Sequence, residues 1–143
     1  MSRIEWQHDG RRIVLPICVM RPETADMTRV TVTALVDTGA STSGITKSVA
    51  EQLDLAPVGK RPLLSARAIV QVERYLFRIG IESPSDSAAP AFPFVFDVTL
   101  GFELGGDLSA DPKRRIDAVL GMDVLSECDF SIDRTGRCRL DFG

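Results

Sequence analysis

The stretch with the clearest chemical potential is the run Asp-Thr-Gly-Ala-Ser at residues 37–41. It comes directly after residues 30–36, an apolar run that is rich in β-forming residues. A carboxylate at the end of an apolar strand is costly to bury unless another group pairs with it. Asp37 is therefore either a turn residue at the surface or a carboxylate that is held in place for chemistry.

Length and composition describe an ordinary globular domain. The chain has 143 residues, of which 44% are hydrophobic and 26% are charged, and this is enough for one domain with a modest core. The formal net charge of -3 gives no reason to expect a nucleic-acid partner. We therefore expect a single domain over residues 1–143 that binds no nucleic acid.

The cysteines and the histidine limit the possible chemistry. Cys18, Cys128 and Cys138 stand at irregular spacings, and His8 is the only histidine. This pattern fits neither a disulfide framework nor a zinc site. A Ser-His-Asp mechanism would need His8, close to the N-terminus, as its base. The sequence thus favours chemistry without a metal or a cofactor, and the irregular thiols favour a reducing compartment.

No part of the sequence predicts a membrane segment. The longest apolar run, residues 13–20, contains Pro16 and is far too short to cross a bilayer. The first residues are polar and charged, without the pattern of a secretory signal. We expect no membrane span in this chain and a cytoplasmic location.

Hydrophobic patterning predicts a mostly β chain. Strands are expected over residues 4–7, 12–20, 28–36, 92–102, 116–121, 129–133 and 137–142, and a β-like region over residues 63–82 is expected to be interrupted at residues 65–68. A helix is expected after Thr46, with Val49, Ala50 and Leu53 on one face and its end near Pro57. A second, short helix is expected over residues 122–128, and loops over residues 83–90 and 103–115.

Two motifs of the chain resemble the signatures of retropepsin-like aspartic proteases, the enzymes of retroviruses and retrotransposons and their bacterial relatives. They are Leu-Val-Asp-Thr-Gly-Ala-Ser at residues 35–41 and Ala-Val-Leu-Gly-Met-Asp-Val-Leu at residues 118–125. The resemblance spans residues 12–142, with both motifs in the right order and at a fitting separation. It implies a mostly β, single-domain, retropepsin-like acid protease barrel with a flap hairpin and a short C-terminal helix.

The resemblance also implies an aspartic endopeptidase that acts as a homodimer. Two carboxylates about 3 Å apart cannot both ionise, so one acts as a base on water while the other, protonated, polarises the scissile carbonyl. The chain holds a single Asp-Thr-Gly, so each of two chains must contribute one Asp37 across a two-fold axis. The expected substrate is a protein or peptide, and no cofactor is needed.

The resemblance gives further roles around Asp37. Thr38 would hydrogen-bond across the axis, and Gly39 would permit the tight turn. Ala40 lacks the hydroxyl that pepsin-like enzymes place against the catalytic carboxylate. Gly121 would support the active-site loop from beneath, and Met122, where the family often has arginine, would support it by packing alone.

Substrate contacts are expected at Ser41 and at a flap over residues 63–81. The flap residues expected to touch substrate are Ser65, Ala66, Arg67, Ala68 and Ile69. The tip has no glycine, unlike the tips of retroviral enzymes, so this flap would be stiffer or differently shaped. Asp123 is expected at the start of the second helix, and residues 3–7 and 137–142 are expected to pair across the dimer.

Two alternatives stay open at this point. The same fold would also suit a non-catalytic dimerisation or peptide-binding module, which the glycine-free flap favours and the intact Asp-Thr-Gly opposes. A small monomeric β-barrel binding protein would require the second motif to be a coincidence.

Overall fold

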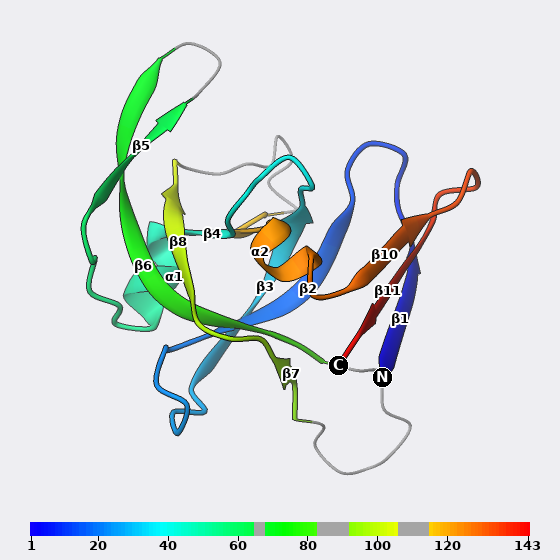
Figure 1. The fold of residues 1–143 in the computed structure, drawn as a ribbon, viewed down its shortest axis with the longest axis horizontal. Coiled ribbons are helices and arrows are strands. Elements are labelled where there is room, and N and C mark those ends of the chain that lie inside the picture. Colours follow the sequence, from blue (N-terminus) through cyan, green and yellow to red (C-terminus); the bar gives the residue numbers. More distant parts are fainter. Residues whose placement is uncertain (65–67, 83–91, 106–114) are drawn as a thin grey trace.

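The computed structural model describes residues 1–64, 68–82, 92–105 and 115–143, and this part of the chain is mostly β, as predicted (Figure 1). In chain order the elements are β1 (Ser2–Gln7), β2 (Val14–Met20), β3 (Arg29–Val36), β4 (Gly44–Thr46), α1 (Lys47–Gln52), β5 (Lys60–Leu64), β6 (Ile69–Ile81), β7 (Phe94–Val95), β8 (Thr99–Leu104), β9 (Ala118–Leu120), α2 (Met122–Leu125), β10 (Asp129–Ile132) and β11 (Arg137–Phe142).

The strands form two sheets. The smaller sheet has the order β1-β11-β10, and the larger one has the order β2-β3-β9-β4-β8-β6-β5. β2 also pairs with β6, between residues 18–20 and 78–80, so the larger sheet curls back on its first strand. β3 and β9 are parallel neighbours, with Val36 opposite Leu120. This register brings the two predicted motifs side by side where both strands end.

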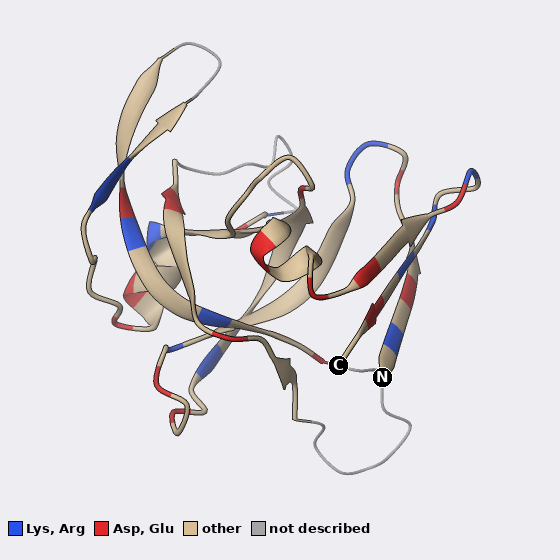
Figure 2. Ribbon diagram, viewed as in Figure 1, with Lys and Arg blue, Asp and Glu red and all other residues tan. Residues whose placement is uncertain are grey.

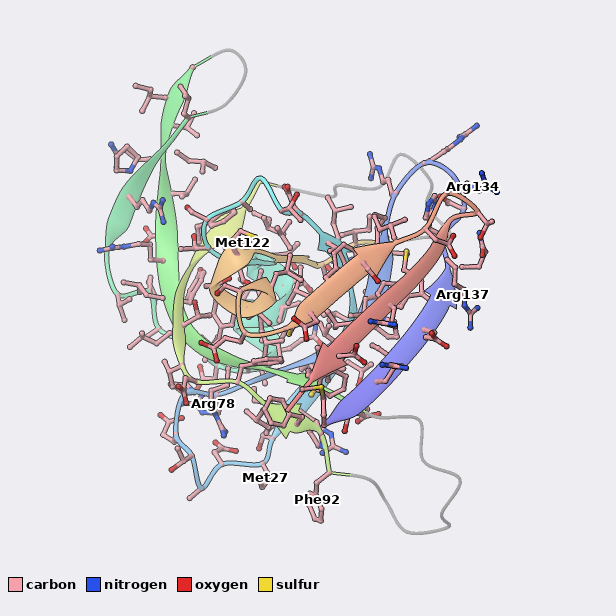
Figure 3. All side chains as sticks on the ribbon, turned by 45° about the vertical axis from the view of Figure 1, so that its right-hand side comes forward. Met27, Arg78, Phe92, Met122, Arg134 and Arg137 are labelled. Carbon is pink, nitrogen blue, oxygen red and sulfur yellow. The ribbon has the colours of Figure 1, made fainter. Side chains whose placement is uncertain are left out.

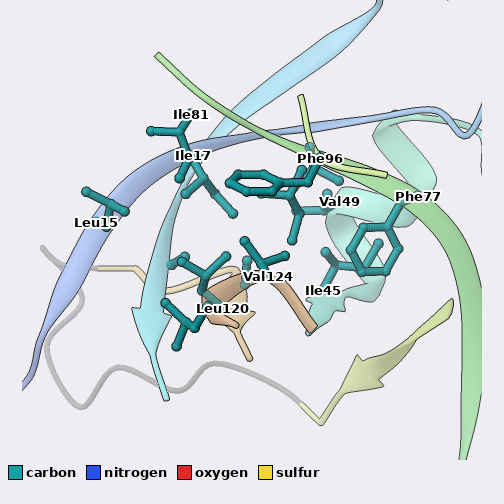
Figure 4. Packing of buried hydrophobic residues seen from close by; sticks show 14 of the residues in the cluster. Leu15, Ile17, Ile45, Val49, Phe77, Ile81, Phe96, Leu120 and Val124 are labelled. Carbon is teal, nitrogen blue, oxygen red and sulfur yellow. The ribbon is translucent and has the colours of Figure 1, made fainter. Parts of the chain in front are cut away.

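The main hydrophobic core takes side chains from both sheets and both helices (Figure 4). Alternate positions of β2, such as Leu15 and Ile17, point into it, and so do Phe77 and Ile79 of β6. Each of these fully buried side chains contributes about 1.5–3 kcal/mol of transfer free energy. These two strands, both predicted from the sequence, thus supply several members of the core.

The first helix begins where predicted but ends earlier. α1 follows Thr46, whose hydroxyl donates to Asp117 Oδ1 at 3.0 Å instead of capping the helix. The helix ends at Gln52 rather than near Pro57. Asp54 then adopts a left-handed backbone conformation with φ of 51°, which an α-helix does not permit.

The predicted strand over residues 92–102 is wrong in its extent. It is divided into β7 and β8, because the chain between them turns the Phe96 side chain into the core. The Phe96 N–H donates to the Ile79 carbonyl at 2.9 Å. β8 then continues to Leu104, into the predicted loop. The remaining parts of the two predicted loops, residues 83–90 and 106–114, lie outside the described residues.

The terminal strands β1 and β11, which were expected to pair across the dimer, pair with each other within one chain. The pairing is antiparallel and runs from Ser2 opposite Phe142 to Gln7 opposite Arg137. Across the sheet, the Trp6 ring stacks on Phe130 with centroids 6.3 Å apart. β11 has a neighbouring strand on both sides, whereas β1 is an edge strand of this sheet.

A buried arginine fixes the connection between β2 and β3. Arg78 on β6 is almost fully buried and donates to the carbonyls of Arg21, Glu23 and Asp26 at 2.6–2.7 Å (Figure 3). Charge-assisted hydrogen bonds of this kind offset the cost of burying the guanidinium. In the described parts of the chain, no helix is long and apolar enough to span a membrane.

Candidate active site

Asp37 begins a tight loop at the end of β3. Its N–H donates to the Leu120 carbonyl at 3.0 Å, which continues the pairing with β9 by one residue. Its carboxylate Oδ1 accepts the N–H of Gly39 at 2.9 Å, and its carbonyl accepts the N–H of Ala40 at 3.2 Å. The side chain thus holds its own turn, and the strand ends here because the chain reverses direction over it.

The segment between β9 and α2 supports this loop from behind. The Met122 N–H donates to the Ala40 carbonyl at 2.8 Å, and the Gly121 N–H donates to Ser43 Oγ at 3.0 Å. A Cβ added to Gly121 would lie 2.7 Å from the carbonyl carbon and oxygen of Thr42, so the close approach requires glycine. The Met122 side chain is 39% exposed; its support comes through the backbone, which corrects the expected packing role.

Asp123 is the centre of a hydrogen-bond network that sequence analysis missed. Its carboxylate accepts the Ser43 N–H at 3.0 Å and the Ser43 hydroxyl at 2.7 Å. It also accepts the Thr99 hydroxyl at 2.5 Å, which connects β8 to the same point. Ser43 is completely buried, so these bonds satisfy two polar groups that no water reaches. The only sequence signal was a carboxylate at a helix start, which does not reveal partners 24 and 80 residues away.

The Asp37 carboxylate bonds to its own loop and takes no part in the Asp123 network. Asp37 is half-buried, and Thr38, Gly39 and Ser41 are exposed. Within the described residues, no hydrogen bond or ion pair joins Asp37 to another carboxylate or to a cation. One chain therefore offers a single positioned carboxylate with its loop accessible on the outer side.

The hairpin β5–β6 corresponds to the predicted flap (Figure 1). Its register runs from Lys60 opposite Glu73 to Leu64 opposite Ile69. Leu63 and Val72 pack on a second hydrophobic cluster that is separate from the main core. Its members are Phe102, Leu104 and Val119, which are buried, and Leu35, Ala40, Leu63 and Val72, which are partly buried. Ala40 belongs to the same cluster, so the hairpin and the active-site loop contact the same buried side chains.

The predicted flap contacts are placed unevenly. Ser65, Ala66 and Arg67 lie outside the described residues. Ala68 and Ile69 are exposed, Ile69 to 69%, and neither is part of the second cluster. The structure therefore brings together the loop residues and Gly121, while the inner face of the hairpin presents Leu63 and Val72.

Polar side chains also connect the hairpin to its surroundings. Arg61 Nη1 donates to Thr42 Oγ1 at 3.2 Å and joins β5 to the active-site loop. The Tyr75 hydroxyl donates to Glu103 Oε1 at 2.7 Å, where β6 leaves β8. Burial and the neighbouring Glu103 carboxylate raise the pKa of Tyr75 far above its usual range, so the phenol remains a donor.

Other features of the described chain lie away from this site. A cavity of about 430 Å³ opens between β1 and β2, and its lining includes Trp6 and Cys18 but neither Asp37 nor its loop. Burial raises the pKa of the Cys18 thiol. In the ranges that the structure covers, no three His, Cys, Asp or Glu side chains are grouped so as to hold a metal ion.

Comparison with known proteins agrees with this geometry. A family model described as aspartyl protease matches residues 24–124, whereas no curated protein sequence matches the chain. Among solved structures, a retropepsin-like aspartic protease from Rickettsia conorii is 20% identical, with a TM-score of 0.65 over 99% of this chain and 91% of that chain.

Two further solved structures are similar at lower scores. The EIAV protease complexed with the inhibitor HBY-793 is 15% identical, with a TM-score of 0.47 over 85% of this chain and 91% of that one. The retroviral protease-like domain of Ddi1 from Leishmania major is 20% identical, with a TM-score of 0.41 over 85% and 82%. The family match covers most of the chain, including the first motif and residues 118–124 of the second, and the fold is that of the Rickettsia enzyme. The chain belongs to the aspartyl protease family and has a retropepsin-like fold.

Proposed function

We propose that this protein is an aspartic endopeptidase that works as a homodimer, with a water molecule activated by the Asp37 carboxylates of two chains. The observation that carries the proposal is the placement of Asp37. It is fixed by hydrogen bonds to Gly39 and Leu120, half-buried, and without a carboxylate partner in the described part of its own chain.

The chemistry follows from bringing two such carboxylates together. At a separation of about 3 Å they share one proton, because two negative charges that close repel strongly. The ionised carboxylate takes a proton from the attacking water, and the protonated one donates a hydrogen bond to the scissile carbonyl. After attack, the proton taken from water is available for the leaving amine. The protein must therefore fix both groups before substrate binds, as the anchored loop does here.

A two-fold arrangement suits the residues around Asp37. Thr38 and Gly39 are exposed at the outer side of the loop, and the Thr38 hydroxyl has no hydrogen-bond partner among the described residues. In an isologous dimer the two copies of this loop face each other. Thr38 then hydrogen-bonds to the partner's loop, and the small Gly39 lets the two backbones approach closely.

The surface next to Asp37 suits an extended peptide with apolar side chains. Leu35, Ala40, Leu63 and Val72 remain partly exposed around the second cluster. Their exposed area forms an apolar surface, here called the apolar floor, which includes Ala40 of the active-site loop and the inner face of the hairpin. A peptide covered by the hairpin would bury this area and exclude water from the reacting bond.

The test compares wild type with Asp37→Asn in the cleavage of an unstructured protein from acidic to neutral pH. Asparagine keeps the shape but supplies neither the base nor the acid, so cleavage should fall by at least about 10³-fold. Asp97→Asn is the matched control, because Asp97 is exposed between β7 and β8. Equal inactivity of wild type and Asp37→Asn, with peptide binding retained, would instead support a non-catalytic peptide-binding module.

Subunit mixing tests the dimer separately. If each site needs two copies of Asp37, a threefold excess of Asp37→Asn protein traps most wild-type subunits in inactive pairs. The activity of a fixed amount of wild type then falls to about a quarter after subunits exchange. Activity that stays constant in the mixture, or a monomer by light scattering at concentrations where cleavage proceeds, would contradict the proposed dimer.

A further inference from the structure

The inner face of the hairpin carries two arginines near its base. On β5, Arg61 lies two positions before Leu63, and on β6, Arg74 lies two positions after Val72. Side chains two positions apart point to the same side of a strand. Because Leu63 and Val72 pack on the second cluster, which Ala40 of the active-site loop also contacts, both arginines lie on the side of the hairpin that faces this cluster.

In the part of the chain that the structure describes, neither guanidinium has an ion-pair partner. Among the described residues, no carboxylate lies within 4.0 Å of Arg61 or Arg74, and Arg74 Nε is buried without a hydrogen-bond partner. The opposite face of the same hairpin behaves differently, because Lys60 pairs with Glu73 at 3.8 Å. Figure 2 shows these positive positions along β5 and β6. The inner face of the hairpin therefore has positive charge without a carboxylate partner among the described residues.

Arg61 lies where a bound peptide would pass. Its Nη1 donates to Thr42 Oγ1 at 3.2 Å, and Thr42 is five residues after Asp37 on the active-site loop. A guanidinium has five N–H donors, so one bond to Thr42 fixes its position and leaves the others available. A planar fork of this kind matches the two oxygens of a carboxylate.

We propose that the cleft selects peptides with an Asp or Glu side chain near, but not at, the cleaved bond, and that Arg61 binds this carboxylate beside Thr42. Arg74 adds positive charge from the base of the hairpin. This inference rests on the proposed peptide substrate and names a specificity-determining residue of the same cleft. The apolar floor accepts the side chains next to the cleaved bond, and Arg61 supplies the charged subsite beyond it.

The experiment uses pairs of peptides with an apolar centre that differ by Glu or Gln at one position, scanned along the peptide. At low ionic strength, wild type should prefer Glu over Gln in kcat/KM by about fivefold at one position. The preference should fall as salt screens the charges. In Arg61→Gln the ratio should drop to about one, and Arg61→Lys should retain part of it.

Lys60→Gln is the matched control. It removes the same charge from the neighbouring position, but on the outer face of the hairpin, so the Glu preference should persist. A wild-type enzyme that cleaves Glu and Gln peptides equally at every position would overturn the inference. So would a preference that survives in Arg61→Gln or that disappears in Lys60→Gln.

Binding separates this inference from the proposed function. The same fluorescein-labelled peptides can be titrated into Asp37→Asn protein, which binds without cleaving. Cleavage without a Glu preference would support the proposed protease function and contradict the charged subsite. If Glu peptides bind more tightly than Gln peptides in a way that depends on Arg61, and wild type cleaves neither, the charged subsite would be supported and the protease function contradicted. Absence of both cleavage and Glu-selective binding overturns both.

Discussion

The active-site loop and the hairpin β5–β6 contact the same small hydrophobic cluster, but they are held in different ways. Ser43 is completely buried, and Asp123 and the Gly121 N–H bond to it. The end of the hairpin instead exposes Leu64 to 80% and Ile69 to 69%. The active-site loop is thus held by buried hydrogen bonds, whereas the hairpin has a small apolar contact and exposed strand ends.

In the proposed endopeptidase, this difference gives the two regions different mechanical roles. Groups that act on the reacting bond must be fixed before substrate arrives, and the loop that carries Asp37 is fixed by bonds to β9 and α2. A covering element must open and close, so it belongs to the low-stability part of a fold. We therefore expect substitutions behind the loop to lower global stability and substitutions in the hairpin to change substrate binding.

The largest effect outside Asp37 is expected for Asp123→Ala. This substitution leaves the Ser43 N–H and hydroxyl, both buried, without their acceptor. Unpaired buried polar groups cost about 1–3 kcal/mol each, so the free energy of unfolding should fall by about 3 kcal/mol. Urea denaturation measures it, and peptide cleavage should fall in parallel as the loop loses its position.

Two variants bracket that prediction. Asp123→Asn keeps one acceptor oxygen and should lose less than Asp123→Ala. Asp129→Ala removes an exposed carboxylate a few residues later and should change stability by no more than about 0.5 kcal/mol. If Asp123→Ala also stayed within this range, the loop would not be anchored through Asp123, and the contrast between the two sides of the cleft would fail.

For the hairpin, Val72→Ala should change binding more than stability. Val72 is only partly buried, so losing two methyl groups should cost no more than about 1 kcal/mol of unfolding free energy. The apolar floor shrinks, so KM for peptides should rise while kcat changes little. Gln71→Ala, on the exposed outer face, is the control. A loss in Val72→Ala as large as that in Asp123→Ala would place the hairpin in the stable core instead.

Sequence reasoning succeeded where the signal is local. The start of α1 after Thr46 and the burial of Val49, Ala50 and Leu53 on one side of this segment follow from spacing alone. The two motifs also predicted that the segment around Gly121 supports the loop, and the structure places it there by backbone bonds. Short-range periodicity was enough for these features because the same residues form the element and its contact.

The features that sequence reasoning missed depend on residues far apart in the chain. Asp123 meets Ser43 from 80 positions away and Thr99 from 24, and nothing near Asp123 specifies either partner. The division between β7 and β8 depends on a bond from Phe96 to Ile79 on another strand. Arg61 likewise gains its position from Thr42. A single sequence records the donors and acceptors but not which of them meet.

The smallest effect is expected in the terminal sheet, which serves as a reference for both sides of the cleft. Asp141 on β11 is 5% exposed. Its Oδ1 accepts a hydrogen bond from Arg3 Nε at 2.6 Å, and its Oδ2 lies 3.2 Å from Arg139 Nε. The hydrogen bond from Arg3, with help from the nearby positive charges, holds the pKa of Asp141 below its ordinary value of 3.8. A lowered pKa stabilises the fold above the ordinary value, and this contribution is lost as the pH falls through the lowered pKa.

Asp141→Asn should therefore be less stable than wild type at neutral pH. This gap in stability between the two proteins should close as the pH falls below about 4. Thermal unfolding of both proteins between pH 7 and pH 2 measures this gap. Arg3→Met should give the same pH dependence from the other side of the pair, and neither variant should change peptide cleavage where the protein is folded. A gap that stays constant down to pH 2 would exclude the ion pair as its cause. Altered cleavage would show that the terminal sheet is coupled to the cleft and that the loop and the hairpin do not control it alone.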